Sequence, residues 1–309
     1  MHIPDSGILD SLEEVVGKEL DRHLGAVREW FPHEYVPWSR GADFDGPLGG
    51  SPWSPDQSPV SYASRTALVV NLLTEDNLPS YHHELAAALG RDSAWGAWLH
   101  RWTAEEARHS IVIRDYLLAS RAVDPVALER ARMQHMSDQS RGDEGGVLDS
   151  ITYVTFQELA TRVSHRNTGQ LAGDPVCDRI LARVAMDENL HMLFYRNVLG
   201  AAFELAPDQT MQAVRDVVIG FHMPGKGMPG FERASARMAL DGIYNIRIHL
   251  DEVVQPVLRK LDALGRTDLS PDGRRAQDEL GAFVAGAAVQ ASAFEERRAE
   301  ILERRSTLG

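Results

Sequence analysis

The stretches EEARH, residues 105–109, and DENLH, residues 187–191, decide how this 309-residue chain folds. Both have the pattern acid-acid-x-x-His, in which the second acid and the histidine are three residues apart. Residues at that spacing project from one face of an α-helix, so each stretch can offer a carboxylate oxygen and an imidazole nitrogen to the same ion. One such pair often occurs by chance, whereas two copies indicate a duplicated unit.

Each copy is preceded by another glutamate at nearly the same distance. Glu75 lies 31 residues before Glu106, and Glu158 lies 30 residues before Glu188. This spacing suits two antiparallel helices of roughly 20 residues joined by a short turn. Two such pairs predict the four helices of a ferritin-like bundle, in which Glu and Glu-x-x-His side chains project inward around two metal ions. The predicted ligands are Glu75, Glu106, His109, Glu158, Glu188 and His191.

The residue types indicate which metal this site binds. Carboxylates are hard ligands that suit iron or manganese and can bridge two ions. Six protein ligands for two ions leave open positions, as a catalytic site requires. We therefore expect two iron ions, with manganese in one or both positions as the alternative, whereas zinc suits this oxygen-rich set less well. Without metal, the bundle would bury charged groups at a large energetic cost.

The rest of the chain also has helical periodicity, which predicts an all-α protein. Proline-rich residues 32–59 predict a long ordered loop or lid, and glycine and proline predict a second loop at 222–230. Helices are expected at about 8–31, 61–89 with an interruption at Pro79, 93–121, 125–135, 147–168, 175–202 and 207–221. Two or three further helices are expected over 231–264 and 271–305. One domain, 1–309, would comprise an N-terminal helix and loop (1–60), the ligand-bearing bundle (61–221), and the second loop with C-terminal helices (222–309).

Composition narrows the class of protein. A net charge of −13 argues against a nucleic-acid-binding protein. No apolar run approaches the roughly 18–20 residues that cross a bilayer, and the N-terminus lacks the features of a signal peptide. The lone Cys177 excludes an intrachain disulfide. These features predict a cytoplasmic protein without a membrane span.

The other histidines are expected to be structural, and Glu84 is expected to be a solvated charge. His82 and His83 resemble a fragment of the histidine boxes of membrane desaturases, but no membrane segment accompanies them. The remaining members of this structural set are His135, His165, His222 and His249.

Four segments resemble the soluble acyl-acyl carrier protein desaturases: TEDNLP at 74–79, WTAEEARH at 102–109, FQELAT at 156–161 and DENLH at 187–191. The stretch SHRNTG at 164–169 and the second loop are similar to the actinobacterial branch of that family, and the similarity spans about residues 10–300. By position, the six predicted ligands match the metal ligands of the family.

The resemblance implies a homodimer of ferritin-like subunits, each with a di-iron centre. This centre would introduce a cis double bond in the middle of a long acyl chain carried on acyl carrier protein, while dioxygen is reduced to water with two electrons from a ferredoxin. Thr161 matches a threonine on the oxygen-binding side. Trp30, Asp187 and His109 match a proposed path for electrons from the surface. Independently of the resemblance, Asp187 and Glu105 could each orient a ligand histidine.

Some residues depart from the plant pattern. Ala107 stands where plant enzymes typically carry Asn, Leu190 stands where they carry a basic residue, and the stretch from Glu75 to Glu106 is shorter. These differences leave the ligands intact but affect the expected substrate and turnover. Lys226 and Arg233 are candidates for contacts with the acidic carrier protein.

Three alternatives stay open at this point. The first is a tailoring oxidase that hydroxylates or desaturates another carrier-bound group with the same site. The second is iron storage in the manner of ferritin, against which the chain length and the two loops argue. The third is a low-activity homologue with a regulatory or binding role.

Overall fold

The computed structural model describes residues 2–137, 145–223 and 230–308, and its regular structure is helical. Within these ranges, strand-like pairing is limited to an isolated bridge between Phe44 and Ser51. The predicted all-α class is therefore confirmed. None of the helices in these three ranges combines the length and the apolar character needed to cross a membrane.

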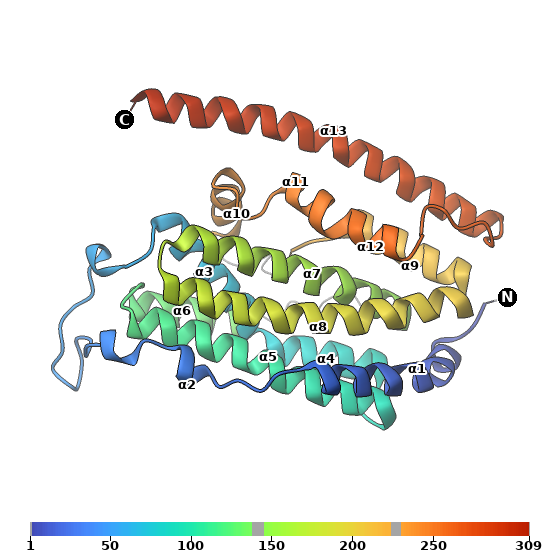
Figure 1. Cartoon of the computed structure of the whole chain (residues 1–309), viewed down its shortest axis with the longest axis horizontal. Coiled ribbons are helices and arrows are strands. Elements are labelled where there is room, and N and C mark those ends of the chain that lie inside the picture. Colours follow the sequence, from blue (N-terminus) through green and yellow to red (C-terminus); the bar gives the residue numbers. More distant parts are fainter. Residues whose placement is uncertain (1, 138–144, 224–229, 309) are drawn as a thin grey trace.

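Four long helices form the centre of the molecule. They are α3 (Tyr62–Asp76), α5 (Ser93–Ala119), α7 (Val147–Ala172) and α8 (Pro175–Leu205). A turn of two residues, which includes Gly173 with a φ of 72°, joins α7 to α8, so these helices lie side by side and antiparallel (Figure 1). In addition, α3 packs on α5 and α7, and α5 packs on α8.

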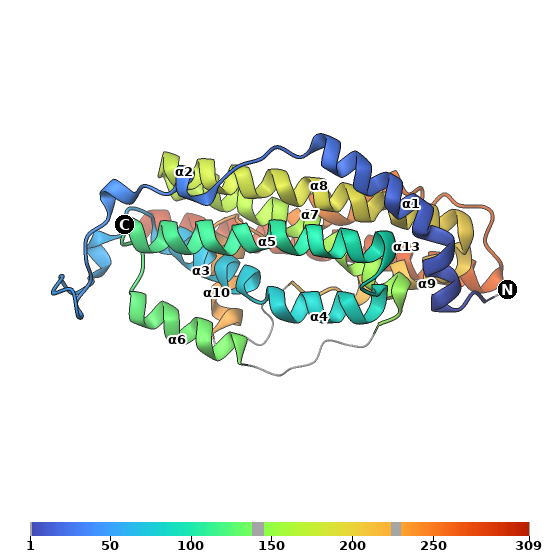
Figure 2. The same cartoon turned by 90° about the horizontal axis from the view of Figure 1, so that it is seen from below.

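Shorter helices surround this bundle. On one side, α1 (Asp5–Ala26) lies along α8 and α5, as Figure 2 shows. On another, α4 (Leu78–Leu89) packs on α5, and α6 (Pro125–Met136) packs on α3. Next in the chain, α9 (Pro207–Gly220) packs against α7, α8 and the C-terminal helix α13 (Pro271–Leu308).

The region 231–264 is helical as predicted, but it is divided into more elements than expected. The chain instead forms α10 (Phe231–Leu240), α11 (Ile246–Ile248), a π-helix η3 (His249–Val254) and α12 (Gln255–Lys260). Gly242, which follows the C-cap residue Asp241 of α10, adopts a φ of 81°. Glycine adopts this left-handed conformation without strain, and it ends the helix.

The helical region predicted at 61–89 is interrupted at Asn77, two residues before Pro79. Helix α3 ends at Asp76, and Pro79 occupies the first turn of α4, where its missing N–H would have no helical partner. Pro79 therefore begins a helix and does not kink one. As a result, Glu75 lies in the last turn of α3.

The proline-rich stretch is an ordered loop, as predicted. It contains three short helical turns, α2 (Pro32–Tyr35), η1 (Trp38–Arg40) and η2 (Pro55–Gln57). The buried guanidinium of Arg121 donates hydrogen bonds to four of its backbone carbonyls, those of Ala42, Asp43, Ser51 and Pro52, at 3.0–3.2 Å. One side chain thus replaces the regular backbone pairing that the loop lacks.

Two apolar clusters fill the bundle, and the polar residues lie between them. On α5, Trp98 and Trp102 belong to the first cluster, while Val112 and Tyr116 belong to the second. Glu106 and His109 fall between these positions on the same helix. The packing on either side therefore shields this polar layer from water.

Candidate metal centre

The structure brings the six predicted ligands together in the middle of the bundle. Their side chains come from the four central helices, and none is more than 7% exposed. Glu75 is on α3 and Glu158 is on α7, while α5 and α8 each contribute one glutamate and one histidine from the repeated motif. Each helix pair thus supplies three of the six groups, as the sequence repeat predicts.

These side chains form two overlapping groups, each with potential ligand atoms within 4.8 Å of one another. The groups share two members, Glu106 and Glu188, one from each copy of the motif. Glu75 and His109 complete the first group, and Glu158 and His191 complete the second. A carboxylate that belongs to both groups can bridge two ions, so the arrangement has the form of a dinuclear site.

Both histidines face the interior of the site with Nδ1. His109 Nδ1 lies 3.3 Å from Glu106 Oε2, 3.3 Å from Glu188 Oε1 and 3.6 Å from Glu75 Oε2. His191 Nδ1 lies 2.7 Å from Glu106 Oε1 and 3.5 Å from Glu158 Oε2. The two imidazoles therefore present equivalent atoms to the shared carboxylates.

Several of these atoms lack a hydrogen bond of acceptable geometry in the described part of the chain. They are Nδ1 of both histidines, Glu106 Oε1 and Glu158 Oε2. Leaving buried polar atoms without a partner is costly, and metal coordination would satisfy all four. Four carboxylates and two imidazoles fit a pair of first-row transition ions such as iron or manganese.

Burial and mutual repulsion shape the pKa values of the acids in the absence of metal. Burial, together with nearby Glu188, raises the pKa of Glu106, and burial with Glu106 raises the pKa of Glu158 well above its ordinary value. For Glu75, burial is outweighed by the nearby imidazoles of His109 and His165, which hold the pKa at about 2. The metal-free site is therefore stabilised by shared protons, which bound metal would displace.

The first acid of each motif contacts the histidine of the other motif. Glu105 Oε2 lies 2.9 Å from His191 Nε2 in a hydrogen bond, whereas Asp187 Oδ2 lies 3.5 Å from His109 Nε2, an ion-pair distance without hydrogen-bond geometry. A carboxylate on Nε2 leaves the Nδ1 lone pair free for metal and fixes the orientation of the ring. This crossed arrangement gives a physical reason for the doubled acid in both EEARH and DENLH.

Trp30 lies next to one of these outer carboxylates. Its indole Nε1 donates a 2.7 Å hydrogen bond to Asp187 Oδ2, and its ring is 4% exposed. The guanidinium groups of Arg108 and Arg183 lie over the indole, 5.0 and 5.7 Å from its centre. Trp30, Asp187 and His109 thus form a continuous series of contacts from the indole to the inner site.

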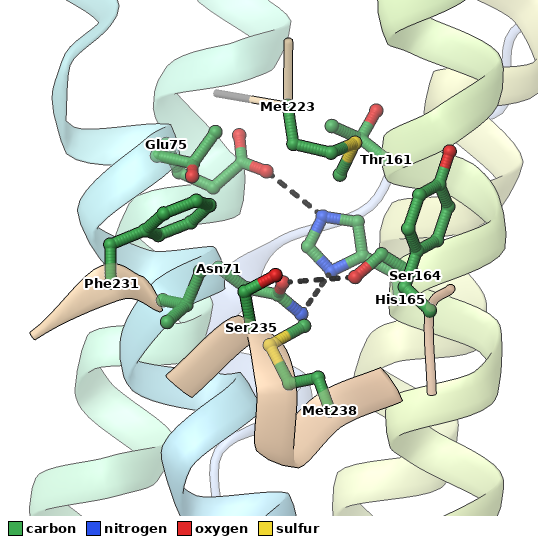
Figure 3. A pocket seen from close by; sticks show the side chains of 12 residues that line it. Asn71, Glu75, Thr161, Ser164, His165, Met223, Phe231, Ser235 and Met238 are labelled. Carbon is green, nitrogen blue, oxygen red and sulfur yellow. Dashed lines mark hydrogen bonds and ion pairs between the residues drawn. The ribbon is translucent and has the colours of Figure 1, made fainter. Parts of the chain in front are cut away.

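Thr161 contacts both the site and its own helix. Its hydroxyl lies 2.9 Å from Glu188 Oε2, 3.0 Å from the Glu158 carbonyl and 3.1 Å from the Gln157 carbonyl. A hydroxyl has one proton, so it can donate fully to only one of these three acceptors at a time. Thr161 and Glu75 also line a cavity of about 40 Å³, which Figure 3 shows.

The sequence did not identify two further polar residues that touch the candidate ligands. His165 Nε2 lies 2.9 Å from Glu75 Oε1, and Trp102 Nε1 donates a 2.8 Å hydrogen bond to Glu158 Oε1. His165, expected to be only structural, is held in turn by Asn71, 3.3 Å from its Nδ1 (Figure 3). Its position seven residues after Glu158, two turns along the same face, could have signalled this contact.

The other candidates lie away from the centre. Glu84 is exposed, as predicted, and His82 bonds Thr103 at 2.8 Å. Arg233 is exposed on α10. Lys226 lies outside the described residues.

This all-helical bundle, with two groups of buried Glu and His that share two carboxylates, could hold a pair of metal ions. Residues 5–307 match the family model described as fatty acid desaturase. The chain belongs to this family.

Relatives with assigned names cover most of the chain. DesA1 of Mycobacterium tuberculosis, named as a candidate acyl-acyl carrier protein desaturase, is 45% identical over 99% of this chain and 93% of its own length. A chloroplastic stearoyl-acyl carrier protein 9-desaturase of Gossypium hirsutum is 30% identical over 88% of this chain and 73% of its own length. The X-ray structure of DesA2 from Mycobacterium tuberculosis superimposes with a TM-score of 0.71 and 27% identity, covering 87% of this chain and 98% of DesA2.

Proposed function

We propose that this protein is a di-iron desaturase that uses dioxygen to introduce a cis double bond into the middle of a long acyl chain carried on acyl carrier protein. The observation that carries the proposal is the pair of overlapping groups that share Glu106 and Glu188. Membership of the fatty acid desaturase family and the names of the relatives support the substrate class. The protein would act in the cytoplasm as a homodimer.

The overall reaction balances with one dioxygen molecule. A –CH₂–CH₂– unit, dioxygen, two electrons and two protons give –CH=CH– and two water molecules. Two iron ions, when bound, supply the redox chemistry that activates dioxygen and removes the two hydrogen atoms. A ferredoxin is the proposed source of the electrons.

The protein contributes by holding groups in place. Glu75, Glu158 and the two histidines would each bind one ion, and Glu106 and Glu188 would bridge the ions. Thr161 would orient Glu188 on the side that faces the cavity. Asp187 would fix the ring of His109 and link it to Trp30, so that electrons reach the site through this series of contacts.

The space beside Glu75 indicates where the acyl chain lies. The 40 Å³ cavity there has apolar side chains on one part of its wall, Val70, Phe231 and Met238, whereas α7 contributes polar side chains. Its volume is far below the roughly 300 Å³ of an ordinary ligand pocket. Val70 and Phe231 separate it from a larger hollow of about 350 Å³ between α3, α6 and α10. Substrate would therefore enter by displacing Phe231, and the exposed Arg233 beside it would attract the acidic carrier.

The test supplies iron-loaded protein with reduced ferredoxin, dioxygen and acyl carrier protein bearing saturated chains of several lengths. Mass spectrometry should detect a product two hydrogen atoms lighter than the substrate. Loss of this product in a Glu188→Gln variant would be the matched control. No olefin at any chain length, with two irons bound, would contradict the proposal, and a hydroxylated product would favour the tailoring oxidase.

A further inference from the structure

His23, on α1, lies beside the centre next to Glu105, the outer carboxylate that Trp30 does not contact. Its Nε2 lies 2.9 Å from Glu105 Oε2, the same oxygen that lies 2.9 Å from His191 Nε2. His23 is 3% exposed and Glu105 is 2% exposed. The three side chains therefore form a buried series from α1, through α5, to the candidate ligand on α8.

The carboxylate of Glu105 takes part in both hydrogen bonds, and its chemistry decides which group donates in each. An ionised carboxylate only accepts, so His23 and His191 must each donate from Nε2–H to Glu105. With its proton on Nε2, His191 keeps the lone pair on Nδ1, the atom that faces Glu106 and Glu158.

The ring of His23 is held rigidly by aromatic neighbours. It meets the indole of Trp98 edge-on at 5.0 Å between ring centres and stacks on His191 at 5.7 Å. Trp98 in turn stacks on Phe194. A side chain fixed in this way can hold Glu105 in one orientation at little cost in side-chain entropy.

We infer that His23 is a positioning residue that holds Glu105 against His191 and so orients His191 Nδ1 toward the metal. The inference rests on the proposed di-iron function, and it concerns only the ion bound by His191 and Glu158. The ion on the His109 side has Trp30 in the corresponding outer place, so removal of His23 should affect the two ions unequally.

The test compares iron binding by the wild-type protein, His23→Phe and His23→Gln. His23→Phe removes the donor but keeps a planar ring, and it should weaken the binding of one of the two irons by about 10- to 100-fold. Mössbauer spectra should change for that iron alone. His23→Gln restores an N–H donor and should recover most of the affinity. His82→Phe, at a histidine in α4 that bonds Thr103 and not Glu105, is the matched control.

The outcomes separate this inference from the proposed function. Wild-type protein that does not bind two irons would overturn both. If the wild type binds two and His23→Phe binds both with unchanged affinity and spectra, only the role of His23 is overturned. Three metal ions per wild-type chain, falling to two in His23→Phe, would also overturn it, because His23 would then be a ligand. Circular dichroism of the metal-free variants checks that the fold is intact.

Discussion

The two sides of the metal centre are alike inside and different outside. Each side has one histidine, one unshared glutamate and an outer carboxylate on the histidine Nε2. Both outer carboxylates also meet Arg108, but Asp187 meets Trp30 and Arg183 as well, whereas Glu105 meets His23 and Arg101. The repeated motif accounts for the common part, and residues outside the repeat create the difference.

This difference indicates separate tasks for the two sides. An indole beneath two guanidinium groups suits the passage of electrons and the approach of an acidic electron donor. An imidazole held between aromatic rings suits a fixed hydrogen-bond geometry. We therefore expect changes on the Trp30 side to affect electron supply and changes on the His23 side to affect metal binding.

The largest effect on iron binding is expected from a change at Glu188, one of the two carboxylates that both sides share. Glu188→Gln removes one shared carboxylate, so both irons should bind more than about 100-fold more weakly. Glu75→Gln removes an unshared carboxylate and should weaken mainly one iron. The iron content after gel filtration measures both effects. Glu188→Gln protein that keeps one tightly bound iron would show that the groups are independent.

A smaller effect is expected from the outer carboxylates. Asp187→Asn and Glu105→Gln should each reduce the affinity of one iron by about 10- to 100-fold, because each histidine loses the group that fixes its ring. Since the contacts are crossed, Asp187→Asn should alter the iron bound by His109 on α5. Spectra in which it alters the iron bound by His191 would refute the crossed arrangement.

The pH dependence of the melting temperature of the metal-free protein tests the buried histidines of the site. Burial alone would lower the pKa of His109 and His191, but the surrounding carboxylates raise both well above 6.5. A raised histidine pKa contributes stability that is complete below the unfolded value and is lost as pH rises. The metal-free protein should therefore melt at lower temperature as pH rises from 6.5 to 9. A melting temperature that rises over this range would contradict the assignment.

The smallest effect on the metal is expected from Trp30→Phe. The variant should keep two irons with unchanged affinity, because Arg108 and Arg183 still hold Asp187 in place when the indole is removed. Its ferredoxin-dependent turnover should fall several-fold, while a small chemical reductant should restore activity. Equal turnover with ferredoxin would exclude Trp30 from the electron path.

The inner residues could be predicted from the sequence because a helix fixes which side chains share a face. Two Glu-x-x-His motifs and the matched upstream glutamates were enough to choose all six. The resemblance to desaturases added Trp30, Asp187 and Thr161. The sequence predicted helical structure over 231–264 but not where it breaks. Gly242, in the left-handed conformation, ends α10.

The outer contacts could not be predicted because they join distant helices. His23 is 82 residues from Glu105, and His165 is 90 residues from Glu75. No periodicity within one helix specifies which face of another packs against it. His23 and His165 were therefore indistinguishable from ordinary buried histidines until the packing of the bundle was known.

The most direct test of the central claim is an anaerobic titration of the metal-free protein with ferrous iron, followed by Mössbauer spectroscopy. The account predicts two ferrous ions per chain, magnetically coupled through the shared Glu106 and Glu188. One iron per chain, or two irons without coupling, would contradict it.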